Sequence, residues 1–204
     1  SFKIKYYYKS MESKELTVVI VTFKSEEKII NCLKSISYNI PVVVVENSDN
    51  KNFKNKIENI FTNVKCILVG ENKGYATANN IGLKSVTTKY ALVLNPDTIL
   101  DKDAIKNFFN TKEQVEDFWL IGPANNQIVN FNENDNNFKE VNNLKGFAIF
   151  FNLSKFNQDY FDENFFLFFE EIDLCRRVKK NKGKIYLHKN ILIKHDGASS
   201  VNKT

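Results

Sequence analysis

Residues 90–100 read YALVLNPDTIL, a stretch in which an apolar run stops abruptly at NPDT, residues 95–98. A buried strand of a parallel sheet typically reads as a nearly continuous apolar run. Because Pro96 has no N–H to donate, it cannot continue the ladder, and the strand is expected to end before it. Asp97 is therefore predicted to lie just past the carboxyl end of a buried strand, where open α/β sheets bind ligands.

The residues alone allow two interpretations of Asp97. A carboxylate at a strand's carboxyl end can hold a divalent cation against a phosphate, because hard cations prefer oxygen ligands. The alternative is that Asp97 only caps a helix whose pattern begins near Lys102. The remainder of the chain favours the first interpretation.

Apolar runs and helix-like stripes alternate along the first half of the chain. The run at 16–22, LTVVIVT, is rich in β-branched residues, and apolar residues recur at helical spacing after Ser25. Further runs at 40–45 and 64–69 flank a second helical stripe over 53–61. Such alternation predicts βαβ units and a parallel sheet. The strand ends expected to share one edge are those at Thr22, Glu46, the turn at Asn72, and Asp97.

The fourth unit contains residues that plain scaffolding does not need. A turn at 70–75, GENKGY, precedes a helical segment at 76–85 that carries Asn79, Asn80 and Gly82. Asn and Gly are poor residues for a helix interior, so their presence indicates a site or close packing.

Composition limits the class of protein. The chain has 204 residues, 43% of them hydrophobic, and we expect one domain over 1–204. No run of about 18 apolar residues and no signal-peptide pattern is present. Three widely spaced cysteines disfavour a disulfide framework or a structural zinc site and suit a reducing cytoplasm. A net charge of +5 is compatible with a polyanionic substrate or an anionic membrane surface, and we expect no nucleic-acid partner.

Several nucleotide-binding classes are disfavoured. No GxGxxG follows the first predicted strand, where TFKSE stands, and no GxxxxGK[ST] occurs. A nucleotidyltransferase would need a Gly-rich loop with Arg or Lys at the same place, which TFKSEE lacks. At the N-terminus, the basic aromatic segment 1–15 suits an edge strand or loose arm, with membrane contact as the alternative.

A different set of motifs is present in order: VVIVTFKSEEKIINCLKSI, VVVVENS, NKGYATANNIG and LVLNPDT. The second half adds GFAIFF at 146–151, FDENFFLFFEEIDLCRR at 161–177 and HDGASS at 195–200. Together, over roughly 16–200, they resemble the inverting glycosyltransferases of family 2, in the rhamnosyltransferase-like branch. The resemblance implies the GT-A fold: a Rossmann-like, mostly parallel sheet flanked by helices, with a smaller mixed region on the acceptor side.

The resemblance also implies roles for the two halves and their residues. Residues 16–100 would bind the nucleotide-sugar and 101–204 would provide the acceptor side and the base. Here Glu170-Glu171 stands where the family has Glu-Asp. The expected base is Glu171, with Asp173 as the alternative, and the acceptor is expected to contact Gly146 and Glu170. Mg²⁺ or Mn²⁺ is expected to be held by Asp97 and His195. The residues expected to contact the donor are Thr22, Glu46, Asn72, Gly74, Asn79 and Asp97.

The activity so implied is transfer of a sugar from a nucleoside diphosphate sugar, with dTDP or UDP favoured, to a glycan or lipid-linked glycan in cell-surface polysaccharide synthesis. The expected location is the cytoplasm, including the inner face of the cell membrane with peripheral association. The alternative is a non-catalytic nucleotide-sugar-binding module or partner subunit. We expect most rings of the run 165–169 in the core and the polar stretch 125–143 as a loop or hairpin.

Overall fold

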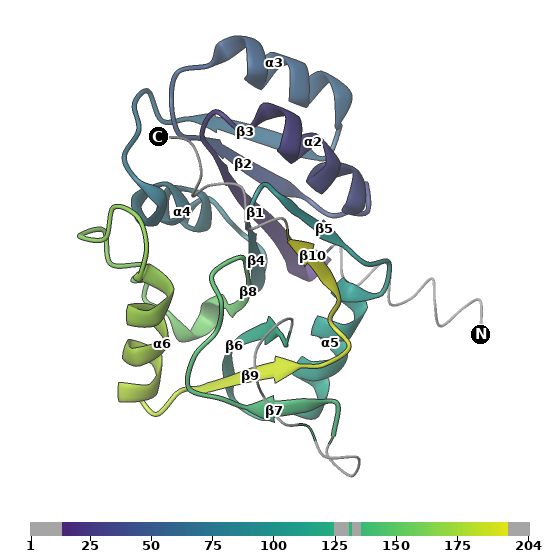
Figure 1. Cartoon of the computed structure of the whole chain (residues 1–204), viewed down its shortest axis with the longest axis vertical. Coiled ribbons are helices and arrows are strands. Elements are labelled where there is room, and N and C mark those ends of the chain that lie inside the picture. The colour runs from purple at the N-terminus through teal and green to yellow at the C-terminus, as the bar shows by residue number, and fades with distance from the viewer. Residues whose placement is uncertain (1–13, 125–130, 132–135, 196–204) are drawn as a thin grey trace.

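The computed structural model describes residues 14–124, 131 and 136–195, and an eight-stranded sheet forms the centre of this region (Figure 1). Helices cover both faces of the sheet. The elements are β1 (Leu16–Thr22), α2 (Glu26–Ser35), β2 (Val42–Glu46), α3 (Lys51–Ile60), β3 (Val64–Leu68), α4 (Tyr75–Lys84), β4 (Tyr90–Leu94), β5 (Thr98–Leu100), α5 (Ala104–Gln114), β6 (Phe118–Pro123), β7 (Phe138–Glu140), β8 (Ala148–Asn152), the 3₁₀ turn η1 (Leu153–Lys155), α6 (Glu170–Lys180), β9 (Lys184–His188) and β10 (Ile193–His195).

The strand order of the large sheet is β3-β2-β1-β4-β8-β6-β9-β7. The first four strands are parallel, as expected from the βαβ pattern. From there the sheet is mixed, because β8 runs antiparallel to both β4 and β6, and β7 runs antiparallel to β9. A separate ribbon pairs β5 with β10. The prediction of a mostly parallel sheet with a smaller mixed region is confirmed.

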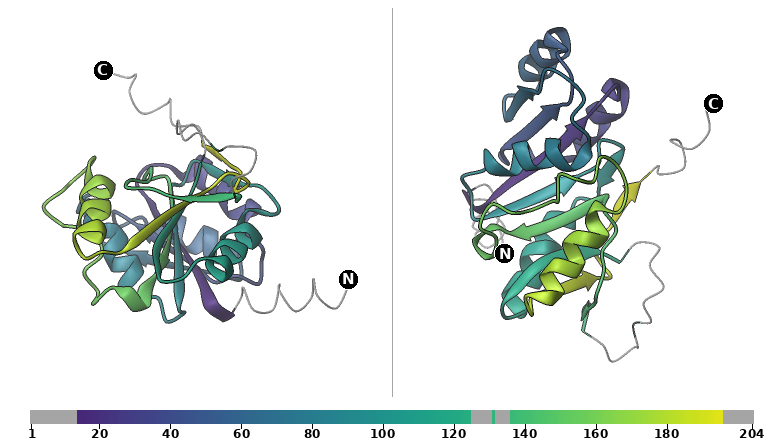
Figure 2. Two further views of the ribbon diagram at one scale, coloured as in Figure 1. Left: turned by 90° about the horizontal axis from the view of Figure 1, so that it is seen from below. Right: turned by 90° about the vertical axis from the view of Figure 1, so that its left-hand side faces the viewer.

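The strands are buried on both faces, which explains their continuous apolar runs. All seven residues of β1 are buried. Its alternate side chains enter two different cores, because successive strand residues point to opposite faces. Leu16, Val18 and Ile20 pack with α2, α3 and α5, whereas Val19 and Val21 pack with α4 and α6. Figure 2 shows these layers from two further directions.

Strand register brings the carboxyl ends of the parallel strands to one edge. Thr22 pairs with Glu46, and two residues earlier Ile20 pairs with Leu94, the last residue of β4. The antiparallel strand β8 begins at this same edge, where Ala148 pairs with Leu94. Residues just after β4 therefore lie beside residues just before β8.

Several expected boundaries and environments differ from the structure. The helix expected to begin near Lys102 starts at Ala104, with Asp103 as its N-cap, and the short strand β5, which was not predicted, begins at Thr98. The expected strands at 40–45 and 146–151 are observed as β2 and β8, each beginning two residues later. The N-terminal segment 1–13 and most of 125–135 lie outside the described residues. No helix in the described part of the chain is long and apolar enough to cross a membrane.

The expectation that most rings of the run 165–169 lie in the core is wrong. Phe166, Phe168 and Phe169 are exposed, and Phe165 is only partly buried. The neighbouring Phe161, by contrast, is buried and joins the core beneath α4 and α6. The run forms a loop that leads into α6, so its apolar side chains have no sheet face to cover.

The poor helix formers of α4 are explained by packing. A Cβ at Gly82 would lie 2.5 Å from Cγ1 of Val19 and 3.0 Å from Cγ2 of Val45, so only glycine allows the helix this close to the sheet. Asn80 donates to the Phe161 carbonyl at 2.8 Å and accepts from the Phe161 N–H at 3.0 Å. These contacts fix α4 against β1 and β2 and fix the segment before α6 against α4.

This packing predicts the effect of Gly82→Ala. The added methyl overpacks the interface between α4 and the sheet, which typically costs about 1–3 kcal/mol. Alanine's better helix propensity returns about 1 kcal/mol at most. We expect a lower urea midpoint with an unchanged slope, whereas Lys84→Ala, on the exposed side of the same helix, should change stability by about 0.5 kcal/mol or less. A Gly82→Ala variant as stable as the parent would contradict the close approach.

Candidate active site

The carboxyl ends of β1 and β2 carry two buried polar side chains. Thr22 and Glu46 are register partners, 2% and 3% exposed, and the Thr22 Oγ1 and Glu46 Oε2 atoms have no hydrogen-bond partner. The other oxygen, Glu46 Oε1, accepts from the Ser48 hydroxyl at 2.6 Å. Burial raises the pKa of the Glu46 carboxyl above its usual range. Unsatisfied buried polar groups are costly, so this pair indicates a place where a ligand supplies the missing partners.

The turn before α4 is tied to the end of β2. Asn47 donates from Nδ2 to Asn72 Oδ1 at 2.9 Å and to the Gly74 carbonyl at 3.2 Å, and its Oδ1 accepts from the Lys73 N–H. Asn72 is exposed and also accepts from the Gly74 N–H at 3.1 Å. The predicted donor-binding residues Asn72 and Gly74 therefore lie at the same edge as Glu46, held there by Asn47.

Gly74 has a second structural role. Its φ of 82° lies in the left-handed region that side chains disfavour. A Cβ at this position would lie 2.7 Å from the Phe166 carbonyl oxygen, and the Tyr75 N–H donates to that oxygen at 2.8 Å. The loop before α6 therefore rests directly on the turn before α4.

The NPDT segment forms a tight turn that presents Asp97. The Thr98 N–H donates to the Asn95 carbonyl at 3.2 Å and the Thr98 hydroxyl donates to it at 2.8 Å. Pro96 occupies the second position of this turn, where its fixed φ is favourable. The Asn95 N–H in turn donates to the Phe147 carbonyl at 2.9 Å. Asp97 does not cap α5, so the capping interpretation is wrong.

The side chains of Asp97 and His195 are close together, as expected if both bind one cation. Asp97 Oδ1 lies 3.3 Å from His195 Nε2, because β10 pairs with β5 immediately after the NPDT turn. The His195 ring stacks on Phe147, with ring centroids 4.7 Å apart and planes 10° apart. Phe147 therefore fixes the orientation of the imidazole.

The donor set suits a cation shared with a substrate. Carboxylate oxygen and imidazole nitrogen are both metal ligands. Among the described residues no group of three or more His, Cys, Asp or Glu side chains gathers to hold a metal. Mg²⁺ is commonly bound through one or two protein ligands together with substrate phosphates and water, so Asp97 and His195 fit such an ion.

Tyr75 lies at the centre of the candidate site. Its hydroxyl donates to Asn95 Oδ1 at 2.9 Å and approaches the Gly146 carbonyl at 3.4 Å. Burial raises the pKa of Tyr75, and the negative charges of nearby acidic groups raise it further. The hydroxyl therefore stays protonated and links the end of β4 to the start of β8. The acidic groups that act on it are Glu170, Glu171 and Asp97.

The three acids at the start of α6 have different surroundings. Glu170 is 7% exposed, its Oε2 has no partner, and burial, with Glu171 adding to it, raises the pKa of Glu170. Glu171 lies against Gly146, where a Cβ would be 3.4–3.5 Å from three of its side-chain carbons. Asp173 is also buried, but its Oδ2 accepts from Arg177 Nε at 2.7 Å and its Oδ1 from Arg176 at 3.2 Å.

These surroundings indicate different roles for Asp173 and for the pair Glu170 and Glu171. Asp173 is held in two ion pairs, and Arg177 also donates to the Tyr160 carbonyl, so this acid fastens α6 to the preceding loop. Glu170 and Glu171 are the acids whose charges reach Tyr75. Tyr75 thus contacts Gly146, against which Glu171 packs, and Asn95, which lies two residues before Asp97.

Unpartnered buried oxygens coincide with residues singled out from the sequence. Asn79 is fully buried and donates from Nδ2 to the Tyr75 carbonyl at 3.0 Å, but its Oδ1 has no partner. Five such side-chain atoms occur in the described part of the chain, and four belong to predicted site residues. The four are Thr22 Oγ1, Glu46 Oε2, Asn79 Oδ1 and Glu170 Oε2.

Sequence reasoning missed four residues that assemble the site, namely Asn47, Tyr75, Asn95 and Phe147. Three of them stand next to a residue that was identified, since Asn47 follows Glu46, Tyr75 follows Gly74 and Phe147 follows Gly146, while Asn95 is two residues before Asp97. The available signal was the unusual density of Asn and Tyr beside strand ends. Their bridging contacts depend on strand order, which residue type alone does not give.

Known proteins resemble this chain in sequence. The low-salt glycan biosynthesis hexosyltransferase Agl10 of Haloferax volcanii is 28% identical over 193 residues, covering 81% of this chain and 62% of that protein. The teichoic acid poly(glycerol phosphate) polymerase of Staphylococcus epidermidis is 32% identical over 99 residues, covering 45% of this chain and 14% of that protein. The chain therefore spans less than two thirds of the length of these relatives.

Solved structures resemble it in fold. S. aureus TarS 1–349 matches with a TM-score of 0.66 and 20% identity, covering 86% of this chain and 58% of that one. The same protein with UDP-GlcNAc matches with a TM-score of 0.65 and 19% identity, covering 92% and 62%. These likenesses show the GT-A fold that the sequence motifs implied.

Family membership follows from a match across most of the chain. The family described as Glycosyl transferase family 2 matches residues 17–175, from the start of β1 into α6. This range includes the strand ends at Thr22 and Glu46, the NPDT turn, and the acids at 170–173. The chain belongs to glycosyltransferase family 2.

Proposed function

We propose that this chain transfers a sugar from a nucleoside diphosphate sugar to a hydroxyl of a glycan or lipid-linked glycan, with inversion at the anomeric carbon. The observation that carries the proposal is that the Tyr75 hydroxyl contacts both Gly146, against which Glu171 packs, and Asn95 of the turn that presents the Asp97–His195 pair. Glu171 suits a general base, and the Asp97–His195 pair suits a cation that binds the diphosphate. Their proximity is what a single displacement requires.

The donor would lie along the carboxyl edge of the parallel strands. Thr22 Oγ1 and Glu46 Oε2 are buried acceptors without a donor, and a pyrimidine base offers an N–H to such groups. Complexes of the structural neighbour TarS with UDP and UDP-GlcNAc support a uridine nucleotide, while dTDP presents the same N–H. Asn79, with its unpartnered Oδ1, would meet the donor from α4.

The diphosphate would lie near the NPDT turn. Asp97 and His195 would hold Mg²⁺ or Mn²⁺ there, and a bound cation of this kind stabilises negative charge that develops on a leaving diphosphate. The turn matters because Asp97 lies within it, and it is closed by hydrogen bonds from Thr98 to the Asn95 carbonyl and from the Asn95 N–H to the Phe147 carbonyl. Preorganisation of this kind lowers the cost of reaching the transition state.

Glu171 would act as the general base. It takes the proton from the acceptor hydroxyl while that oxygen bonds to the anomeric carbon and the bond to the diphosphate oxygen breaks. The electron pair of the broken bond leaves with the diphosphate, so no covalent enzyme intermediate forms. Gly146 would leave room for the acceptor beside Glu171, and Glu170 would accept a hydrogen bond from another acceptor hydroxyl.

Donor binding is the first test. The chain is screened by thermal shift against UDP-, dTDP- and GDP-sugars with Mn²⁺, and hydrolysis of the donors is followed by NMR, which reports the anomeric configuration of the product. A ligand at 100 times its dissociation constant stabilises by about 2.7 kcal/mol, or roughly 5–10 °C for a domain of this size. Binding without turnover would favour the non-catalytic module, and absence of binding to every donor would contradict the proposal.

Asp97→Asn should remove metal-dependent activity while the fold persists. The substitution keeps the size of the side chain but removes the negative charge that attracts the cation. We expect Mn²⁺ binding in the presence of UDP, measured by electron paramagnetic resonance, to weaken at least about tenfold, with His195→Ala showing a smaller loss. Asp103→Asn, an acid at the start of α5 outside the site, is the matched control. Normal turnover and normal metal dependence in Asp97→Asn would remove Asp97 from the site.

Glu46→Gln should raise the stability of the fold near neutral pH but weaken nucleotide binding. Because burial raises the pKa of Glu46, the folded parent loses stability as pH rises through that pKa, and the amide does not. The variant should therefore gain stability relative to the parent as the pH is raised from about 4 towards 7. Calorimetry should show weaker nucleotide binding at pH 7. Unchanged nucleotide affinity would exclude Glu46 from the donor site.

Substitutions at the start of α6 distinguish a base from a structural acid. Glu171→Gln should lose about 10²–10⁴ in turnover while donor binding and melting temperature hold. Asp173→Asn breaks ion pairs with Arg176 and Arg177 and should cost about 1–3 kcal/mol of stability. If instead Asp173→Asn abolished turnover at unchanged stability and Glu171→Gln did not, Asp173 would be the base.

A further inference from the structure

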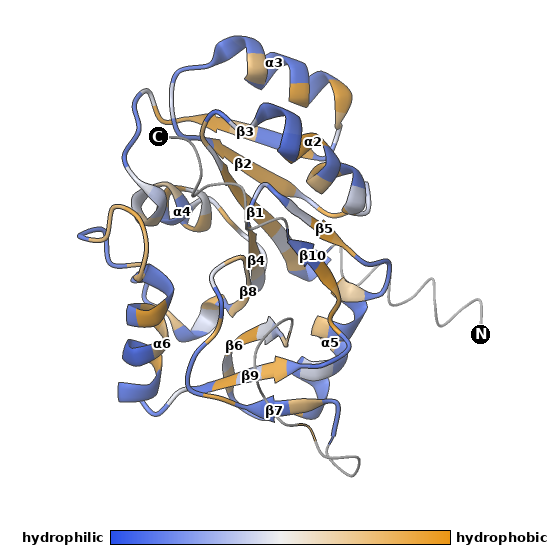
Figure 3. Ribbon diagram, viewed as in Figure 1, coloured by the Kyte–Doolittle hydropathy of each residue, from blue (hydrophilic) through white to orange (hydrophobic). Residues whose placement is uncertain are grey.

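A cluster of large apolar side chains projects from the loop before α6. Phe166, Leu167, Phe168 and Phe169 are 53–63% exposed, and Ile172 in the first turn of α6 is 47% exposed. We call these five residues the apolar tip. Figure 3 shows the loop in orange above a mostly blue α6. Contiguous exposed apolar groups of this kind mark interaction sites more often than single exposed residues do.

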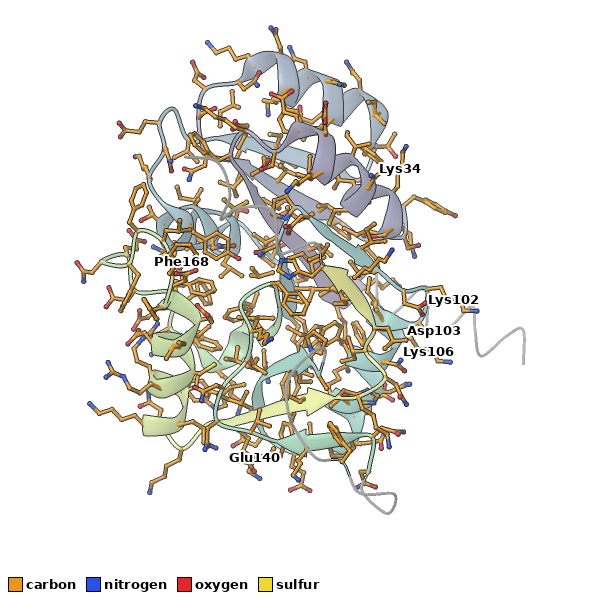
Figure 4. The ribbon with its side chains drawn as sticks, viewed as in Figure 1. Lys34, Lys102, Asp103, Lys106, Glu140 and Phe168 are labelled. Carbon is orange, nitrogen blue, oxygen red and sulfur yellow. The ribbon has the colours of Figure 1, made fainter. Side chains whose placement is uncertain are left out.

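The backbone holds the apolar tip outward. Phe168 and Phe169 have φ values of 70° and 69°, a left-handed conformation that is unfavourable for bulky residues. Phe166 is fixed at the other end of the loop, because its carbonyl accepts from the Tyr75 N–H and its backbone packs on Gly74. A strained conformation that keeps rings in water indicates that the rings have another partner. In Figure 4, Phe168 lies near the start of α6 on the side of α4, away from Lys102 and Lys106.

Positive charges continue from the apolar tip along α6. Ile172, Arg176 and Lys180 are four residues apart and exposed, so they form one stripe of the helix surface. The Arg176 side chain is 81% exposed even though it reaches Asp173 Oδ1 at 3.2 Å. Lys179, beside the stripe, pairs with Glu140 at 2.8 Å.

Two acidic side chains near the loop before α6 have polar or charged partners. Glu163 lies 3.7 Å from Lys84 and accepts from Asn80 at 2.9 Å. Asp162 accepts from the backbone and side chain of Asn164. The surface thus combines an apolar end with a cationic stripe, and the carboxylates of Asp162 and Glu163 beside it have hydrogen-bond partners.

We propose that the apolar tip inserts into the surface of an anionic lipid bilayer, with Arg176 and Lys180 against the lipid phosphates. Apolar side chains in the acyl boundary with cations at the headgroups are the arrangement that interfacial anchors use. A glycan would stack only on the phenylalanine rings and would leave the aliphatic Leu167 and Ile172 and the cationic stripe unmatched, whereas an anionic bilayer engages all of them. A second copy of the chain would bring the same cationic stripe against itself.

This surface would determine how the acceptor arrives. Glu170 and Glu171 lie between Phe169 and Ile172 of the apolar tip, so a hydroxyl close to the bilayer surface would meet the proposed base. A lipid-linked glycan presents its sugars at that level. This last step rests on the proposed function, whereas binding to lipid does not.

Vesicle binding tests the proposal without any transfer reaction. The chain is floated with vesicles of phosphatidylcholine that contain about 30% phosphatidylglycerol, and with phosphatidylcholine alone. We expect binding to the anionic vesicles, weakened at high salt. Leu167→Ser/Phe168→Ser should reduce partitioning at least about tenfold, because two large side chains no longer enter the acyl boundary. Arg176→Gln/Lys180→Gln should each contribute about a fivefold loss at low salt.

The matched control replaces exposed apolar residues elsewhere. Tyr38→Ser/Ile60→Ser removes side chains that are 79% and 54% exposed on the far side of the sheet, and should leave vesicle binding unchanged. Melting temperature confirms that each variant is folded. The proposal fails if the parent does not bind anionic vesicles, or if the apolar-tip variant binds as the parent does. It also fails if the substitutions abolish only a concentration-dependent dimer or raise only the KM for a soluble acceptor.

Discussion

The hydrogen bond from the Asn95 N–H to the Phe147 carbonyl is the contact on which the candidate site depends. It forms because β8 runs antiparallel to β4, so that the first residue of β8 pairs with the last residue of β4. Had β8 been parallel, its start would lie at the opposite edge of the sheet, far from Asp97. One reversal of strand direction therefore joins the parallel half of the sheet to the mixed half beside Asp97.

Several side chains around that point are in environments that lower the stability of the fold. One buried side-chain oxygen in each of Thr22, Glu46, Asn79 and Glu170 lacks a hydrogen-bond partner. Each such group lowers the free energy of unfolding by about 1–3 kcal/mol. The surrounding core compensates, since β1 and β4 are buried along their whole length and Gly82 lets α4 pack closely. Unfavourable groups collected at one edge of an otherwise well-packed sheet are typical of a binding site.

The scaffold was more predictable than the assembly of the site. Continuous β-branched runs such as 16–22 can only be buried strands, so the parallel half and its ligand edge followed from pattern. Asp97 and Glu46 were identified because they end such runs. Tyr75 and Phe147 were not, because their importance comes from which strands are neighbours. The ring run 165–169 was misplaced because apolar composition does not reveal that Phe168 and Phe169 adopt left-handed backbone conformations.

Gly74 has a consequence for the order of events at the site. The loop before α6 rests on it with no space for a side chain, and the Tyr75 N–H holds the same loop. The turn before α4 and the loop before α6 therefore share one contact, and a displacement of one disturbs the other. If the proposed donor binds at the turn and the proposed acceptor at the loop, each would by thermodynamic reciprocity change the affinity of the other by the same factor. A single glycine thus makes the turn before α4 and the loop before α6 mechanically dependent on each other.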